Sequence, residues 1–271
     1  MRYRRFVTVS ESSSVDIPEL VSQVLTLRPE KQFWFRGQGC ASRHLVPSLW
    51  RRMQPAPGQT EVTSSQVLDL ETRLLTRFRQ RSLPYWPAGY PQTDWEHLFA
   101  MQHYGLPTRL LDWTTNLLMA VYFALDHDRS RCECGTGACQ PTIWILDPVK
   151  LNHTNPRLDG LPVGIMATTD KLLDQWEPGV ADTQFARAPV AIYGTYNSDR
   201  IAAQSGAFTV SGKTMTPLDE MVQEEGVLRK LVLTRDPDEI RTQLTLMGVT
   251  RSSVYPGLAE LAQDIASEEI R

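Results

Sequence analysis

Residues 95–125 constrain the fold of this chain most, because they predict four different local structures in succession. Residues 95–103 suit a helix, and the Gly-Leu-Pro sequence at 105–107 interrupts it. Residues 109–113 then suit a short strand, followed by an apolar helix over 116–125 that Asn116 caps. A strand between two helices excludes an all-helical and an all-β fold.

The remaining elements predict the same class. A further helix is expected over 66–81, and helix starts are expected at Thr216 and Asp236, with Gly248 ending the second. Strands are expected at 32–36, 142–146, 190–193, 207–210 and 229–233. Because strands and helices do not alternate regularly, we predict an α+β fold with a mixed or antiparallel central sheet flanked by helices. We expect residues 1–271 to form a single domain, with a helical N-terminal portion to about 104.

Composition limits the cellular setting. The chain is 41% hydrophobic with a net charge of -3, which is typical of a globular protein with a substantial core. The longest apolar run covers residues 117–125, far short of the roughly 18 residues that cross a bilayer. The N-terminus turns polar where a secretory signal needs apolar residues. We therefore expect a cytoplasmic protein with reduced thiols and no membrane partner.

The charge is distributed unevenly along the chain. Residues 1–83 contain 13 Lys and Arg against 7 Asp and Glu, a balance of +6, which leaves the remainder at -9. A basic segment favours a phosphate-bearing ligand or a nucleic acid. Solvated helix faces carrying arginines with no ligand explain the same asymmetry.

Five segments together resemble the FRG-domain family of bacterial proteins. They are FWFRGQG at 33–39, LVPSLWRR at 45–52, the block at 95–125 with QHYGLPTRLLDWT, RIAAQSGAFTV at 200–210, and the ending at 244–265. The resemblance implies one FRG-type domain over almost the whole chain. The family is named for its Phe-Arg-Gly motif and not for a reaction. The proteins with which the family is associated imply a toxin or antiphage effector.

A fainter similarity connects the chain with ADP-ribosyltransferases. Phe35-Arg36-Gly37 is similar to their first strand, and 111–115 leading into a helix is similar to their Ser/Thr strand. Where that family has a catalytic Glu on a later strand, this chain has Gln204. The resemblance implies an ADP-ribosyltransferase-like core with NAD as substrate, but Gln204 cannot supply the negative charge that stabilises a ribosyl cation.

Arg36 is the first candidate for ligand binding. A guanidinium holds a phosphate through two hydrogen bonds and keeps its charge, which suits the pyrophosphate of NAD. Gly37 would allow the backbone to approach the ligand. The alternative is a structural arginine paired with a buried carboxylate.

The candidate catalytic residues are Arg36, Asp112, Thr114 and Gln204. Asp112 can replace the missing Glu, or can equally be the buried partner of Arg36 or Arg109. Thr114, together with Thr115, offers hydroxyls at a helix start that suit a ribose or phosphate, although helix capping explains them as well.

Further candidates would contact the cofactor. Gln102 and His103 end a helix and can orient a nicotinamide or ribose, whereas a histidine there also serves as a helix-dipole partner. Trp113 can stack on a base or lie in the core. Arg109 and, by analogy, Phe208 complete the cofactor-binding set.

A separate cluster predicts a metal loop within 127–140. His127, Cys132, Cys134 and Cys139 have the side chains that a tetrahedral structural zinc needs. Their spacing is less typical than paired Cys-x2-Cys, so a surface loop of free thiols remains the alternative.

These observations favour an NAD-directed enzyme that transfers ADP-ribose to an unidentified macromolecular acceptor or to water. A non-catalytic nucleotide-sensing or protein-binding module is the alternative that Gln204 favours. A nucleic-acid-binding protein is a third hypothesis, which the basic first segment favours and the absence of a basic run disfavours.

Overall fold

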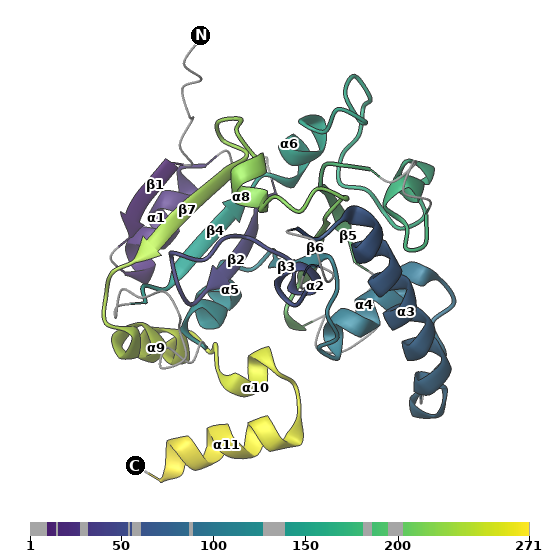
Figure 1. The fold of residues 1–271 in the computed structure, drawn as a ribbon. Helices are drawn as coiled ribbons and strands as arrows, with labels where there is room; N and C mark the ends of the chain where they lie inside the picture. The colour runs from purple at the N-terminus through teal and green to yellow at the C-terminus, as the bar shows by residue number, and fades with distance from the viewer. Residues whose placement is uncertain are drawn as a thin grey trace.

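The chain forms a seven-stranded sheet covered by helices (Figure 1). The computed structural model describes residues 10–14, 16–27, 32–53, 55, 61–86, 89–126, 139–180, 186–194 and 203–270. The strands are β1 (Ser10–Ser14), β2 (Trp34–Gln38), β3 (Leu110–Thr114), β4 (Thr142–Leu146), β5 (Val190–Tyr193), β6 (Gly206–Val210) and β7 (Leu228–Leu233). The helices are α1 (Ile17–Leu25), α2 (Ser48–Arg51), α3 (Ser64–Ser82), α4 (Asp94–His103), α5 (Leu117–Leu125), α6 (Pro148–His153), α8 (Leu218–Met221), α9 (Pro237–Leu246), α10 (Arg251–Val254) and α11 (Leu258–Glu269), with short 3-10 helices η1 (Leu83–Tyr85) and η3 (Lys171–Trp176).

The predicted α+β class with a mixed sheet is confirmed. The strand order is β1-β7-β4-β2-β3-β6-β5, and every neighbouring pair is antiparallel except β1 and β7, which are parallel. All six predicted strands are present within two residues of the expected bounds. The N-terminal portion contains strands as well as helices, and one of them, β1 at the sheet edge, was not predicted.

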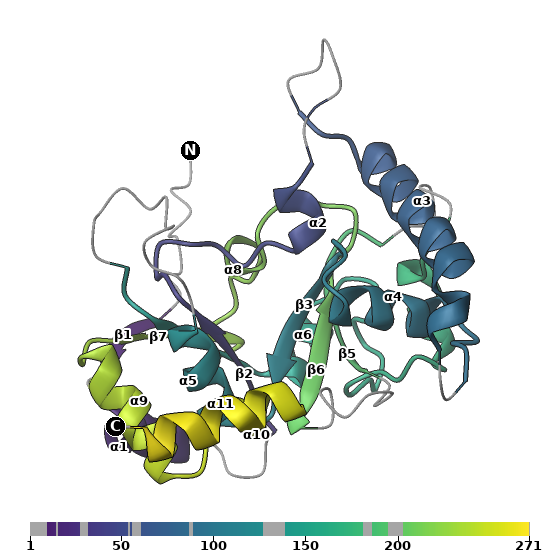
Figure 2. The same ribbon diagram turned by 90° about the horizontal axis from the view of Figure 1, so that it is seen from below.

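The sheet opens between β2 and β3. These neighbours pair only at Phe35 and Thr114, whereas β2 pairs with β4 and β3 pairs with β6 along their full lengths. Because β2 and β3 are antiparallel, the residues after Phe35 diverge from those before Thr114. Figure 2 shows the two strands close together at one end and apart at the other. We call this opening the β2–β3 fork.

Helix α5 packs directly against β2, and Gly37 makes this contact possible. A Cβ at Gly37 would lie 1.9 Å from the carbonyl oxygen of Ala120 and 2.5 Å from the amide nitrogen of Ala124. Asn116 caps α5 as predicted, accepting a hydrogen bond from the amide of Leu118 at 3.0 Å. Gly37 is therefore needed for packing of the strand on the helix.

Apolar side chains form cores on both faces of the sheet. On one face, α1, α5 and α9 cover β2, β4 and β7, and their buried residues form one cluster. On the other face, tryptophans of β2, β3 and β4 pack with residues of α6 and α8. A third cluster joins α4 and η3 to β3, β5 and β6. In Figures 1 and 2, α3 and α4 lie beside the β3–β6–β5 end, and α10 and α11 lie beyond α5.

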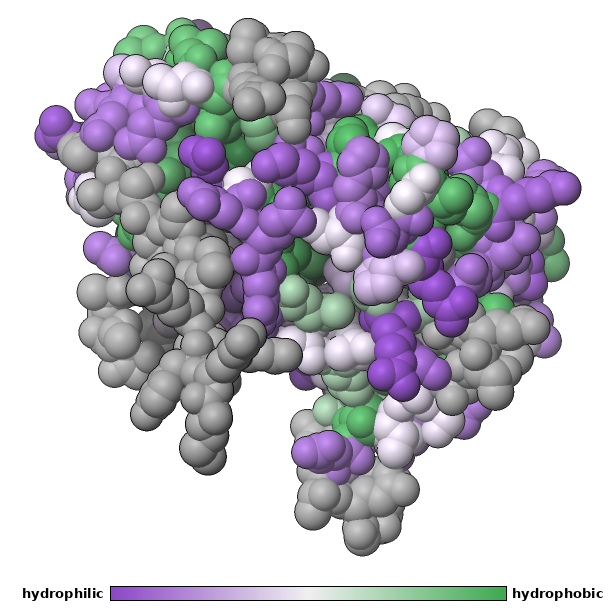
Figure 3. Space-filling model, turned by 90° about the horizontal axis from the view of Figure 1, so that it is seen from above, coloured by the Kyte–Doolittle hydropathy of each residue, from purple (hydrophilic) through white to green (hydrophobic). Residues whose placement is uncertain are grey.

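The face of the molecule that Figure 3 shows is largely hydrophilic among the described residues. On the face in Figure 3, hydrophilic residues occupy much of the centre and the larger apolar patches lie toward the periphery. Within the part of the chain that the structure describes, no helix combines the length and apolar character that a membrane span requires.

Candidate ligand pocket at the β2–β3 fork

A pocket of about 370 Å³ lies at the β2–β3 fork. This volume is in the range of small-ligand sites, roughly 300–1,000 Å³. Residues from β2, α4, β3, α5, the turn before β6, β6 itself and the C-terminal segment meet there. The lining residues are Phe35, Arg36, Gly37, Phe99, Gln102, His103, Asp112, Trp113, Thr114, Phe123, Asp126, Gln204, Gly206, Phe208 and Tyr255. The structure thus brings together nine of the predicted site residues from three distant parts of the sequence.

Arg36 connects the two arms of the fork. Its Nη1 donates a hydrogen bond to the backbone carbonyl of Asp112 at 2.7 Å and lies 3.9 Å from the carboxylate oxygen Oδ2 of the same residue. Its Nε is buried and has no hydrogen-bond partner. Burial lowers the pKa of the Arg36 guanidinium, and the Asp112 carboxylate opposes that shift. Arg36 is therefore a partly buried cation with an unused donor at the pocket.

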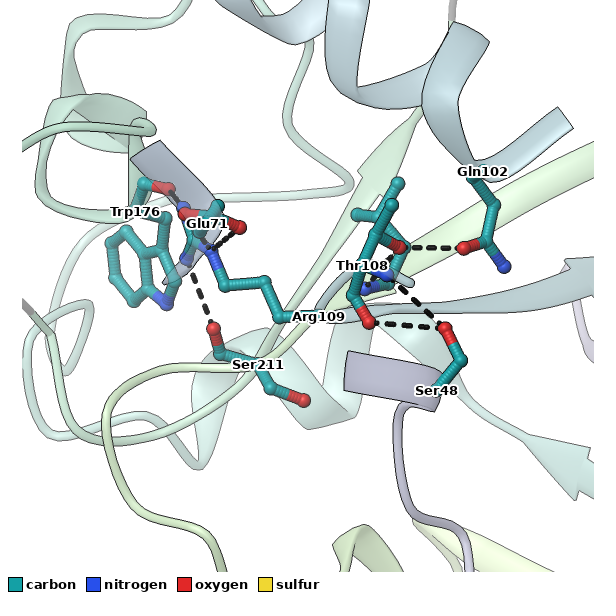
Figure 4. A network of polar contacts seen from close by, with 8 residues as sticks. Ser48, Glu71, Gln102, Thr108, Arg109, Trp176 and Ser211 are labelled. Carbon is teal, nitrogen blue, oxygen red and sulfur yellow. Dashed lines mark hydrogen bonds and ion pairs between the residues drawn. The ribbon is translucent and has the colours of Figure 1, made fainter. Parts of the chain in front are cut away.

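Asp112 lies opposite Arg36 and is held by a chain of polar contacts. Its Oδ2 accepts a hydrogen bond from the side-chain amide of Gln102 at 2.6 Å, and the Gln102 oxygen accepts one from Thr108 at 2.5 Å. Thr108 in turn exchanges hydrogen bonds with Ser48 of α2 (Figure 4). The Asp112 side chain is 54% exposed, so its carboxylate is oriented by the protein and reachable by a ligand.

Thr114 and Gln204 mainly tie backbone segments together. The Thr114 hydroxyl donates to the carbonyl of Gln204 at 2.6 Å and accepts from the amide of Asn116 at 3.0 Å. The Gln204 side-chain amide donates to the carbonyl of Val254 in α10 at 3.0 Å. Ser205, which follows, has a φ of +49°, the left-handed region that a non-glycine residue seldom adopts. Both predicted residues line the pocket, but the Thr114 hydroxyl and the Gln204 side-chain nitrogen already have partners.

Aromatic rings form much of the pocket wall. Phe99 of α4 and Phe208 of β6 stack with ring centroids 4.8 Å apart. Trp113 is 3% exposed and donates its indole N–H to the hydroxyl of Thr209 at 3.0 Å, so most of its ring belongs to the core. Phe123 of α5 and Tyr255 beyond α10 pack edge to face with centroids 6.1 Å apart. Aromatic rings in the wall suit a planar ligand.

Sequence reasoning missed a second carboxylate in the pocket. Asp126, at the end of α5, accepts a hydrogen bond from the Tyr255 hydroxyl at 2.8 Å. These residues are 129 positions apart in the chain, and the Tyr-Pro-Gly sequence of the predicted ending offered no local signal of chemistry. His103 lines the same pocket, and its ring packs edge to face against Tyr104 at 4.7 Å.

Two predicted contact residues lie away from the pocket. Arg109 is fully buried, and its Nε donates to both carboxylate oxygens of Glu71 in α3, at 2.8 and 3.0 Å (Figure 4). Its Nη1 and Nη2 donate to the carbonyls of Ser211 and Trp176. A guanidinium satisfied in this way is structural, which corrects its predicted ligand role. Thr115 is outside the pocket lining, and its amide donates to the carbonyl of Ser205.

The predicted zinc loop lies mostly outside the described residues. His127, Cys132 and Cys134 fall in the segment 127–138, and Cys139 is described as partly exposed. The described residues contain no group of three or more metal-ligating side chains. The zinc site therefore stays a prediction.

One family model matches the part of the chain that forms the fork. Residues 31–132 match the family model of the FRG domain. This match supports the FRG family for the chain. The matched residues run from just before β2 to just after α5 and include both arms of the fork, with Arg36 and Asp112. Strand β6 and Tyr255, which complete the pocket, lie outside the match. No curated protein and no solved structure matches the chain.

Proposed function

We propose that the fork pocket binds NAD and cleaves its nicotinamide–ribose bond, transferring ADP-ribose to a macromolecule or to water. The observation that carries the proposal is the meeting of Arg36 and Asp112 across the fork, in a pocket of about 370 Å³ with aromatic walls. An arginine suits the pyrophosphate of a dinucleotide, a carboxylate suits its ribose, and aromatic rings suit its bases.

Arg36 would hold the pyrophosphate. Its unpartnered Nε and the fixed planar geometry of the guanidinium leave donors for a phosphate oxygen. Burial makes such a contact stronger than on the open surface, because water competes less for the charge. A bound phosphate would also add a second negative charge, besides that of Asp112, next to the desolvated Arg36 guanidinium.

Asp112 would act at the ribose. As the bond from the anomeric carbon to nicotinamide breaks, nicotinamide leaves with the bonding electron pair and the ribose carbon becomes cation-like. The Asp112 carboxylate would stabilise that positive charge. The oxygen of the acceptor then bonds to the ribose carbon, and its proton passes to Asp112. Gln102 fixes the carboxylate for this role through the hydrogen bond of 2.6 Å.

The test is release of nicotinamide from NAD, measured by liquid chromatography. We expect the native chain to turn over NAD. In Asp112→Asn the turnover rate should fall at least about 100-fold, the scale of a lost acid–base or charge-stabilising group. In Arg36→Gln the dissociation constant for NAD should rise. Asp159→Asn, an exposed aspartate outside the pocket, is the matched control and should behave as the native chain. Unchanged turnover in Asp112→Asn would remove the assigned catalytic role.

A binding module without chemistry is the second candidate. The observation that favours it is the hydrogen bond from Gln204 to the carbonyl of Val254. This bond gives a structural role to the residue that stands where ADP-ribosyltransferases have a catalytic Glu. Calorimetry distinguishes the candidates: NAD or ADP-ribose that binds through Arg36 but is never cleaved, with a full set of acceptors present, supports the module.

A further inference from the structure

Three arginines gather on the segment that closes the open end of the fork. Arg43 lies in the loop after β2, and Arg51 and Arg52 lie at the end of α2. The loop leaves the tip of β2, and α2 is fixed beside the start of β3, where the amide of Leu49 donates to the carbonyl of Thr108 at 3.0 Å. Figure 2 shows this segment running from one arm of the fork to the other. The arginines therefore border the mouth of the fork.

These cations lack an ion-pair partner within the described residues. None of the three makes an ion pair or side-chain hydrogen bond with any residue in the described part of the chain. Burial lowers the pKa of Arg51, and the nearby charges of Arg43 and Arg52 lower it further, while Asp112 opposes the shift. Arg51 also lowers the pKa of Arg36 inside the pocket. Held together in this way, the guanidiniums repel one another until an anion binds.

The surroundings favour phosphates over a lipid surface. The large exposed hydrophobic side chains of the described residues all lie outside 39–53, so this segment offers nothing to insert into a bilayer. Arginine forks match phosphate oxygens bidentately, and several of them along one segment match a repeating phosphate backbone. Next to them lies a pocket with partly exposed rings of Phe123 and Tyr255, on which an unpaired base can stack.

We propose that Arg43, Arg51 and Arg52 form a docking surface for the phosphodiester backbone of a single-stranded nucleic acid, which presents one nucleotide to the fork pocket. The docking itself is independent of NAD. Only the further step, in which the docked strand is the acceptor of ADP-ribose, rests on the proposed function.

The test is fluorescence anisotropy with labelled 20-nucleotide single strands of RNA and of DNA, in the absence of NAD. We expect the full chain to bind at least one of them, and the triple variant Arg43→Gln/Arg51→Gln/Arg52→Gln to bind at least tenfold more weakly. Loss of three phosphate contacts should reduce the slope of log affinity against log salt by about 2, at about 0.7 per contact. The variant with lysine at all three positions should retain most of the affinity.

The matched control removes three arginines from the exposed side of α3, at Arg73, Arg77 and Arg81, with the same change in net charge. Its affinity should stay within about twofold of the native chain, because the screened field of distant charges contributes little. An equal loss in this control, native affinity in the triple variant, or absence of binding to both strands overturns the proposal. Because no NAD is present, none of these outcomes depends on catalysis.

Discussion

Removal of Glu71 should show that the buried Arg109 ion pair holds α3 to the sheet. Both side chains are almost fully buried, at 0% exposure for Arg109 and 2% for Glu71. In Glu71→Ala the guanidinium loses both hydrogen bonds from Nε and the carboxylate paired with it, while the carbonyls of Ser211 and Trp176 remain. A buried charge left without its partner costs about 3–5 kcal/mol, a large part of a typical total stability of about 5–15 kcal/mol.

The assay is urea unfolding followed by circular dichroism. We expect Glu71→Ala to lose about 3–5 kcal/mol, and Glu71→Gln, which keeps one acceptor oxygen but not the charge, to lose about 1.5–3 kcal/mol. The double variant Glu71→Leu/Arg109→Met should be much more stable than the sum of its single variants predicts, because no unpaired charge remains. Asp69→Ala, on the exposed side of the same helix, should change stability by less than about 0.5 kcal/mol.

The reasoning would be refuted if Glu71→Ala cost less than about 1 kcal/mol, or if the two single variants were additive in the cycle. Either result would mean that the carbonyl hydrogen bonds alone satisfy Arg109. The pair would then not explain why this arginine, only three positions from Asp112, is absent from the pocket.

Two further predictions test the architecture around the fork. Gly37→Ala should lower the free energy of unfolding by about 1–3 kcal/mol or more in urea, because its Cβ would meet the backbone of Ala120 at 1.9 Å; native stability would show that the strand can shift without cost. Burial lowers the pKa of His97, so the unfolded chain binds a proton at this residue more readily than the folded chain does. The contribution of neutral His97 to the free energy of unfolding should therefore be complete above pH 6.5 and should decrease as the pH falls below that value. His97→Gln should flatten that part of the stability profile, and a profile identical to that of the native chain would exclude His97 as its source.

Much of the local structure was predictable because its signals are local. Apolar spacing and cap residues lie within a few positions of the elements they specify, which is why helix α5 and strand β4 were predicted almost to the residue. Strand β1 was missed because Ser10–Ser14 has no apolar alternation; it joins the sheet edge by backbone pairing with β7. The short helix α10 carries one buried residue and likewise gave no periodic signal.

The candidate site was predictable in part. Arg36, Asp112 and Gln204 were identified by a resemblance, and the structure places them at one pocket. Asp126 was not identified, because its significance depends on Tyr255, which reaches it from the far end of the chain. Hydrogen-bond partners separated by more than a hundred residues leave no spacing to read in a sequence.

The sequence by itself determined the α+β class, most of the strands, and the presence of an arginine and an aspartate flanked by apolar residues. Only the tertiary structure decided which of two arginines lies at the pocket. Arg36 lies on β2 and Arg109 directly precedes the neighbouring strand β3. Glu71 neutralises Arg109 in the core, whereas Arg36 lies where β2 and β3 part and keeps an unpartnered Nε. A buried guanidinium whose charge is matched inside the core has a structural role, and one that keeps an unused donor at a pocket is available to bind a ligand.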